Sequence, residues 1–235
     1  MSTIPMDIET CQRCKLRKPG WFCDLSPHAM AEYDALGANL MLPEGGILFA
    51  EGQLPRSVSV ICEGRVKLTK SSRGGKTLLV KIATAGDVLG LSAALSRTSY
   101  EVTAQAMGRT SVRIFPQQAF LSFIQRHAEG SFRAAESLSN EYRSLLSDAY
   151  RLALSKSIAG RVAHLLLQLV VEGDDPLHAQ PGIHMALRHE ELAAMLGSSR
   201  ETVTRVLGDF KRKGIIATQG TRMTVLRKEA LEQLL

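Results

Sequence analysis

The sequence predicts an α+β chain: a domain of short strands, then a long helix, then a small helical domain that ends in a β-hairpin. Between residues 40 and 115, short apolar runs alternate with glycines such as Gly52, Gly64 and Gly90. Short strands with turn signals about every 8–12 residues are typical of a barrel or a sandwich. From residue 117 to residue 171, apolar residues recur at the spacing of an amphipathic helix. Two shorter helical segments and a hairpin follow residue 182.

Within the strand region, we expect strands at residues 58–61, 66–68, 78–82 and 112–115. A short helix is expected before them at residues 27–36, and the segment that precedes this helix has little periodicity. That first segment is therefore predicted to be rich in loops.

The composition sets limits on the class of protein. The 235 residues suffice for one large or two modest domains, and with 45% hydrophobic but only 5% aromatic residues we expect aliphatic cores. The net charge of +6 suits a polyanion such as nucleic acid. No stretch approaches the roughly 20 apolar residues that cross a bilayer, and the N-terminus lacks the pattern of a signal peptide. We expect a cytoplasmic protein with no membrane partner, in which thiols stay mostly reduced.

The long helix carries one apolar seam with spacings that alternate between four and three residues, as in a coiled coil. This spacing predicts the interface of a homodimer; the alternative is a stripe that packs on the strand domain of the same chain. Leu146 and Leu154 lie off the seam and could make that second contact. The seam consists of Leu138, Tyr142, Leu145, Ala149 and Leu152.

The segment from residue 188 to residue 207 has the pattern of a helix-turn-helix. Leu192 and Leu196 give the first helix an apolar face, and Gly197 permits the tight turn. Ser198 is the expected N-cap of the second helix, with Glu201 completing a capping box. The hairpin over residues 214–226 would add a two-stranded wing. These features predict a winged helix-turn-helix that binds double-stranded DNA.

The second helix of this motif separates apolar from polar residues. Val203, Val206, Leu207 and Phe210 would be buried, which leaves polar residues exposed near the N-terminus, where a recognition helix meets base edges. Arginine can fork onto guanine and glutamate can accept from cytosine, whereas lysines suit phosphates. Alternatively, Glu201 only caps the helix, Arg205 is a surface charge, and residues 211–213 complement the helix dipole. The candidate DNA contacts are Ser199, Arg200, Glu201, Thr202, Thr204, Arg205, Lys211, Lys213 and Arg222.

The cysteines form a second candidate site. Cys11, Cys14 and Cys23 lie close together in the sequence, and thiolates at the C-x-x-C spacing can bind a metal or a cluster. Basic residues among them are expected to favour the thiolate forms. Cys62 is the remaining candidate for a fourth ligand, or else a small buried apolar residue. An iron–sulfur cluster, zinc and a redox-active dithiol all stay open at this point.

These motifs resemble those of the CRP/FNR family of bacterial regulators, across nearly the full length. The segment Arg200-Glu-Thr-Val-Thr-Arg205 looks like the family's recognition helix, and Gly86-Asp-Val-Leu-Gly90 looks like a turn of its cyclic-nucleotide-binding-like β-roll. The resemblance implies an α+β fold: a jelly-roll sensor, a dimerisation helix and a winged helix-turn-helix. It implies base contacts by Arg200, Glu201 and Arg205 on a palindromic operator, and RNA polymerase as a partner. The expected parts are a cysteine segment (1–27), the β-roll (28–130), the dimerisation helix (131–156) and the DNA-binding domain (157–235).

Two departures from the family bear on the signal that is sensed. Leu91 stands where nucleotide-binding members carry a glutamate, and Thr98-Ser99 stands where they carry Arg-Ser, so a cyclic phosphate would lose its charged partners. The N-terminal cysteines resemble those of FNR-type members, which hold an oxygen-labile cluster. Those members have a fourth ligand in the strand that corresponds to residues 111–115, which has no cysteine in this sequence.

The resulting expectation is a regulator that responds to oxygen, nitric oxide or redox state through a [4Fe–4S] cluster on Cys11, Cys14, Cys23 and Cys62, with zinc as the alternative. A small organic ligand or a cyclic nucleotide bound in the β-roll is a second alternative. A thiol oxidoreductase is a remote one, because no βαβ pattern follows the C-x-x-C pair. No G-x-S-x-G, Walker or H-E-x-x-H motif occurs in the sequence, and we expect no enzyme.

Overall fold

The computed structural model describes residues 10–71, 77–154, 157–169, 182–183, 189, 192–193, 196–219 and 222–235, without the side chains of residues 147–154, 168–169, 182–183, 219 and 222. The contacts within the chain divide it into two units: Met1–Leu68 with Ala83–Arg143, and Thr69–Ile82 with Ser144–Leu235. Among the described residues, no helix combines the length and the apolar character needed to span a bilayer.

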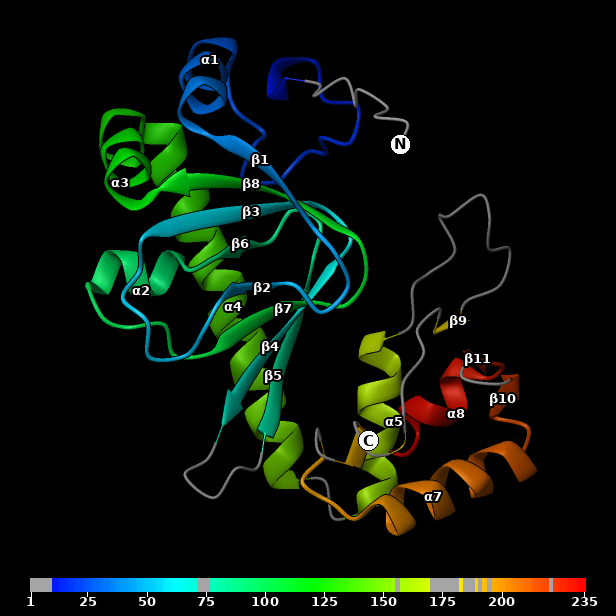
Figure 1. Cartoon of the computed structure of the whole chain (residues 1–235). Coiled ribbons are helices and arrows are strands. Elements are labelled where there is room, and N and C mark those ends of the chain that lie inside the picture. Colours follow the sequence, from blue (N-terminus) through cyan, green and yellow to red (C-terminus); the bar gives the residue numbers. More distant parts are fainter. Residues whose placement is uncertain are drawn as a thin grey trace, which may run out of the picture. The chain divides into compact units, whose positions relative to one another are not determined.

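The strand region folds into two four-stranded sheets, with strand orders β1-β8-β3-β6 and β2-β7-β4-β5 (Figure 1). Strand β8 lies between β1 and β3 and pairs with both in antiparallel fashion. This arrangement agrees with the jelly-roll prediction. The elements in order are the 3-10 helix η1 (Cys11–Arg13), α1 (Pro27–Leu36), β1 (Ala38–Leu42), β2 (Ile47–Phe49), β3 (Ser57–Glu63), β4 (Arg65–Ser71), β5 (Thr77–Thr84), β6 (Val88–Leu89), α2 (Leu91–Ser96), β7 (Thr103–Ala106), β8 (Thr110–Pro116) and α3 (Gln117–Arg126).

Two cores stabilise this region, and strand β3 contributes to both. Successive side chains of a strand point to opposite faces, so Val58 and Val60 enter one core while Ile61 enters the other, which also takes residues from the second sheet. The first core is aromatic, because Tyr33 of α1 lies 4.5 Å from Phe115 of β8 between ring centroids and Phe120 of α3 lies 5.4 Å from Phe115. The expectation of purely aliphatic cores is therefore wrong: composition gives the number of aromatic residues, not where they gather.

The long helix α4 (Ala128–Leu154) follows α3. Ala134 is buried in the aromatic core, and Leu138, a member of the predicted seam, is half-buried and packs against that core. Leu146, expected to face the β-roll, is 40% exposed. The exposed large apolar residues of α4 are Phe132, Tyr142, Leu145 and Leu146. The side chains of Ala149 and Leu152, two further members of the predicted seam, lie outside the described part of the chain.

The C-terminal elements are α5 (Ile158–Leu169), β9 (Gly182–Ile183), α7 (Arg200–Arg212), β10 (Ile216–Gln219), β11 (Arg222–Val225) and α8 (Lys228–Glu232). Helix α5 packs against α7 and α8. Strands β10 and β11 form the predicted hairpin, and β9 pairs with β11 as a third strand. The prediction of a two-stranded wing missed β9, because a two-residue strand has no measurable periodicity.

Candidate DNA interface and cysteine site

The turn before α7 fixes where this helix, the predicted recognition helix, begins. Gly197 has φ +58°, and the Ser198 N–H donates to the Ala193 carbonyl at 3.0 Å. This is the six-to-one hydrogen bond of a Schellman motif, which ends the preceding helix. Because the Ser198 N–H completes the end of the preceding helix, the N-cap of α7 is Ser199. The Ser199 hydroxyl accepts the Thr202 N–H at 3.2 Å. The expected N-cap at Ser198 is therefore wrong by one residue.

Helix α7 has the predicted division into two faces. Val203, Val206, Leu207 and Phe210 are buried. Arg200, Glu201, Thr204 and Arg205 are exposed, and Thr202 is half-buried. Lys211 and Lys213 are exposed at the other end of the helix, whereas the side chain of Arg222 lies outside the described residues.

Three contacts that the sequence did not reveal hold this face in place. The His189 Nδ1 lies 2.9 Å from the Thr204 hydroxyl, so a residue of the preceding helix orients one polar residue of α7. Arg161 of α5 donates to the Leu196 carbonyl at 3.1 Å, at the turn. Hydrogen bonds from its own backbone N–H and from the Ser199 hydroxyl lower the pKa of Glu201, which is therefore ionised at neutral pH.

The segment that carries the N-terminal cysteines packs on the β-roll. The Cys11 N–H donates to Asp34 Oδ1 of α1 at 3.0 Å. Trp21 lies against Gly86, where an added Cβ would meet the indole at 2.7 Å. Phe22 is only 3% exposed and joins the aromatic core, with its ring centroid 5.1 Å from that of Phe120.

All four cysteines are half-buried free thiols, and the ionisation of one would oppose the ionisation of others. Cys62 and Cys23 oppose the ionisation of Cys11, and Cys14 opposes the ionisation of both Cys23 and Cys62. The structure thus brings Cys62 near the three N-terminal cysteines. In the described ranges, no three or more histidine, cysteine or acidic side chains are already arranged to hold a metal ion.

Burial controls the ionisation of these thiols. It raises the pKa of Cys11 to about 12 and that of Cys23 to about 11, and it also raises the pKa of Cys62. Arg17 lowers the pKa of Cys23, but burial outweighs this effect. The expectation that the basic residues among the N-terminal cysteines favour thiolates is therefore wrong for Cys11 and Cys23, because the desolvation of a buried charge exceeds the attraction of exposed cations.

Cys62 lies at an irregularity of the sheet. Strand β3 pairs with β8 as Ile61↔Val112 and then Glu63↔Ser111, so Cys62 is the extra residue of a β-bulge. Strand β8 is the strand in which the FNR-type resemblance places a fourth cysteine. Cys62 therefore lies on the strand next to that position.

A buried ion pair lies beside the cysteines. Arg113 of β8 donates to Asp34 Oδ1 at 2.7 Å and to Asn39 Oδ1 at 2.9 Å, and its side chain is 6% exposed. Its positive charge acts to lower the pKa of Cys11 and of Cys62. Sequence reasoning missed Arg113, although an arginine within the apolar strand 112–115 was a visible signal.

The position that nucleotide-binding members use for the ribose is apolar in this structure. Leu91, at the start of α2, is 2% exposed and belongs to the aromatic core. The hydroxyls of Thr98 and Ser96 form a hydrogen bond at 2.7 Å. The structure thus agrees with the sequence in showing no charged residue at the position of Leu91, where nucleotide-binding members carry a glutamate.

Comparison with known proteins matches both halves of the chain. Residues 40–127 match the family described as "Cyclic nucleotide-binding domain", and residues 160–234 match "Crp-like helix-turn-helix domain". The Transcriptional regulator LdrP of Thermus thermophilus is 31% identical over 189 residues, which are 79% of this chain and 91% of LdrP. The chain belongs to the CRP/FNR family. It is a DNA-binding transcription regulator of that family.

Other members of the CRP/FNR family show similar coverage. The "CRP-like cAMP-activated global transcriptional regulator" of Mycobacterium tuberculosis is 28% identical over 224 residues, 92% of this chain and 96% of that protein. The solved structure of FixK2 from Bradyrhizobium japonicum aligns with a TM-score of 0.70 at 21% identity, covering 84% of this chain and 96% of FixK2. The FixK2 comparison supports the fold, and α7 lies within the residues that match the Crp-like helix-turn-helix domain.

Proposed function

We propose that this CRP/FNR regulator binds a palindromic operator as a homodimer and responds to oxygen, nitric oxide or redox state through a [4Fe–4S] cluster on its four cysteines. The exposed apolar residues Phe132, Tyr142, Leu145 and Leu146 of α4 support self-association through this helix. RNA polymerase is the expected partner at the promoter.

For the DNA-binding half, the proposal rests on the exposed face of α7. Arg205 would read a base edge, and Lys213 would bind phosphate. Arg205→Ala should cost about 1–3 kcal/mol and relax sequence preference at one position, whereas Lys213→Ala should weaken all duplexes alike and reduce the salt dependence. Fluorescence anisotropy with a selected palindrome and a scrambled duplex measures both effects. Equal losses on the two duplexes for Arg205→Ala would contradict base readout.

For the sensing half, one observation carries the proposal: Cys62, distant in sequence, lies near the N-terminal cysteines at a bulge of the β3–β8 pair. Four sulfur donors fit either a [4Fe–4S] cluster or zinc. Cys11, Cys14, Cys23 and Cys62 would hold the group, and a cluster would supply sensitivity to oxygen and nitric oxide.

Metal binding would require a chemical change in these residues. Because burial raises the pKa of Cys11 and Cys23 to about 12 and about 11, these thiols are protonated at neutral pH and must release protons when they bind a metal. Metal affinity is therefore expected to rise with pH. The thiols must also converge, since they are not yet set at metal-binding distances.

The test is preparation of the full chain without air, followed by assays for iron, acid-labile sulfide and zinc and by visible absorption. We expect equal amounts of iron and sulfide, a brown colour that air bleaches, and loss of the iron in Cys62→Ala. A colourless protein with one zinc per chain would mean that the cysteines bind zinc and not a cluster. A metal-free protein would remove the sensing half of the proposal but leave DNA binding intact.

A further inference from the structure

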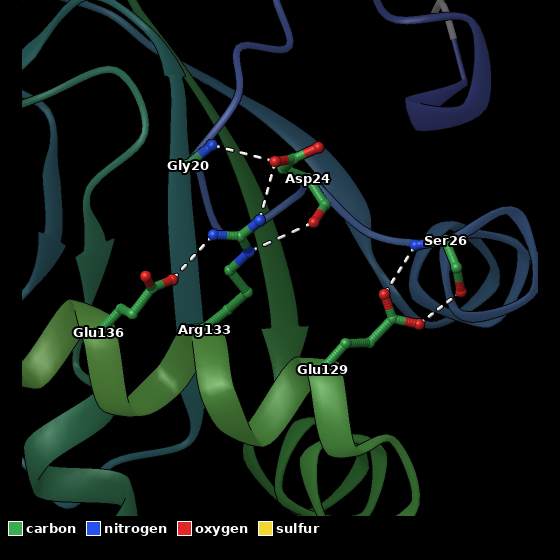
Figure 2. Close-up of polar contacts among 6 residues, drawn as sticks. All are labelled: Gly20, Asp24, Ser26, Glu129, Arg133 and Glu136. Atoms are coloured by element: carbon green, nitrogen blue, oxygen red, sulfur yellow. Dashed lines mark hydrogen bonds and ion pairs between the residues drawn. The ribbon is translucent and has the colours of Figure 1, made fainter.

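The residues that follow Cys23 are bound to the start of helix α4 (Figure 2). Arg133 donates from Nη2 to Asp24 Oδ2 at 2.8 Å and from Nε to the Asp24 carbonyl at 3.3 Å. Asp24 Oδ2 also accepts the Gly20 N–H at 3.0 Å, which ties the two sides of Cys23 together. One guanidinium thus holds the loop around Cys23 from α4.

Glu129, one turn earlier on α4, makes a second connection to the same segment. Its carboxylate accepts the Ser26 N–H at 2.7 Å and also the Ser26 hydroxyl. These two hydrogen bonds lower the pKa of Glu129, so the carboxylate is ionised at neutral pH. Ser26 is also the N-cap of α1, where its hydroxyl accepts the Ala29 N–H at 3.4 Å.

We call these two connections, Asp24–Arg133 and Ser26–Glu129, the clasp. Asp24 and Arg133 are 109 positions apart in the sequence, and Ser26 and Glu129 are 103 positions apart. The Arg133 side chain is only 20% exposed, and Glu136 accepts from its Nη1 at 2.8 Å, so its direction is set from both sides. Such charge-assisted bonds in a partly buried site are stronger than those of an exposed ion pair.

Glu129 and Arg133 are four residues apart and therefore lie on one face of α4. Tyr142, 63% exposed, is nine residues from Arg133 and therefore lies on the opposite face, since nine residues make about two and a half helical turns. The same helix thus carries the clasp on one side and the exposed apolar residues Tyr142, Leu145 and Leu146 on the other. The clasp is thus a direct polar connection through which a change in the cysteine segment can reach the helix, beside the aromatic core that Phe22 and Ala134 share.

We propose that Glu129 and Arg133 are positioning residues that couple the state of the cysteine segment to the placement of α4, and through α4 to self-association. This inference rests on the proposed function, because it takes a cysteine-bound group as the signal. For this coupling, the hydrogen bonds of the clasp must differ in strength between two states of the cysteine segment. A signal shifts an equilibrium between two states only when it interacts differently with each of them.

The first experiment needs no metal. In the metal-free full chain, Arg133→Met should raise the rates at which iodoacetamide alkylates Cys11 and Cys23. Peptide mass spectrometry measures these rates. We expect about a tenfold increase, corresponding to the loss of one charge-assisted hydrogen bond. Trp21, the only tryptophan of the chain, should shift its emission to the red. Arg143→Met, an exposed arginine on the same helix, is the matched control and should change neither.

The second experiment measures coupling in a way that a purely structural role would not affect. Sedimentation velocity gives the dimer dissociation constant of the iron-loaded and of the metal-free protein. In the wild type, the ratio of the two constants should be about 5–150-fold, the usual range of coupling between sites. Arg133→Met should bring this ratio near one at unchanged iron content, and Arg133→Lys should give an intermediate ratio.

The outcomes separate this inference from the proposed function. If the wild type takes up no iron, the sensing function fails, and the clasp is judged by the alkylation rates alone. Unchanged rates in Arg133→Met would then overturn it. If iron binds but the wild-type ratio is one, or if Arg133→Met keeps the full ratio, the clasp does not transmit the signal.

Discussion

Helix α4 carries the predicted dimer seam and α7 the proposed DNA contacts, and the first turns of these two helices are held in different ways. The start of α7 is held by its own neighbours, because Ser199 caps the N–H of Thr202 three residues later. The start of α4 is held by Ser26 and Asp24, more than a hundred residues earlier. The start of α7 is thus held by its own cap and by residues of the same C-terminal domain, His189 and Arg161, whereas the helix of the predicted dimer seam is held by a segment more than a hundred residues away. We infer that a signal in the cysteine segment can move α4 while leaving the reading face of α7 intact.

The largest effect is expected from the buried ion pair of the first unit. Arg113→Met leaves the carboxylate of Asp34, 12% exposed, without its cation. We expect the free energy of unfolding to fall by about 3–5 kcal/mol, as when one partner of a buried pair is removed. Urea denaturation of the metal-free chain measures this loss.

The control for this prediction is the double variant Asp34→Asn/Arg113→Met, which leaves no unpaired buried charge. It should be more stable than Arg113→Met alone. If Arg113→Met costs less than about 1 kcal/mol, the pair behaves like a surface ion pair. The first unit would then depend less on distant contacts than the comparison of the two helices suggests.

The same contrast explains what sequence reasoning could find. The apolar face of α7 and the turn at Gly197 follow from local patterns, and both were predicted. The N-cap was misplaced by one residue because two adjacent serines fit the pattern and only the hydrogen bond of Ser198 to Ala193 separates them. Strands β3, β4, β5 and β8 were predicted from apolar runs between glycines, since turns are also local signals, whereas β1, β2, β6 and β7 were not predicted.

The contacts of the cysteine segment could not be predicted in this way. No spacing rule joins Asp24 to Arg133 or Trp21 to Gly86, because these contacts depend on the tertiary fold. The same limit applies to the contact of Leu138 with the aromatic core of its own chain, which its seam spacing does not reveal. The four cysteines were singled out as a set, but only the structure shows that Cys62 lies near the others.

A smaller effect is expected where Trp21 packs on the β-roll. Gly86 has φ +94°, and a Cβ there would lie 2.7 Å from the indole. Gly86→Ala should therefore cost about 1–3 kcal/mol from overpacking, in addition to the backbone strain of a left-handed residue. The measurements are urea denaturation and the emission of Trp21, which should shift to the red as the ring leaves its site.

Gly52→Ala is the matched control, because Gly52 has φ +82° and nothing lies within 4 Å of an added Cβ. It should lose only the backbone contribution, about 1–2 kcal/mol, with no change in emission. Equal losses for the two variants, with Trp21 unshifted, would mean that the cysteine segment does not depend on this contact.

The smallest effect is expected at the start of α7. Ser199→Ala removes the N-cap and should cost about 1 kcal/mol, which corresponds to about 2–4 °C in Tm for a chain of this size. Ser198→Ala should cost less than about 0.5 kcal/mol, because Ser198 contributes its backbone N–H and not its hydroxyl to the turn. Thermal unfolding followed by circular dichroism compares the two, while Trp21 emission reports on the first unit. A larger loss of stability from Ser198→Ala than from Ser199→Ala would mean that Ser198 is the N-cap. A shift of Trp21 emission in Ser199→Ala would mean that the start of α7 also depends on distant contacts, and the contrast with α4 would disappear.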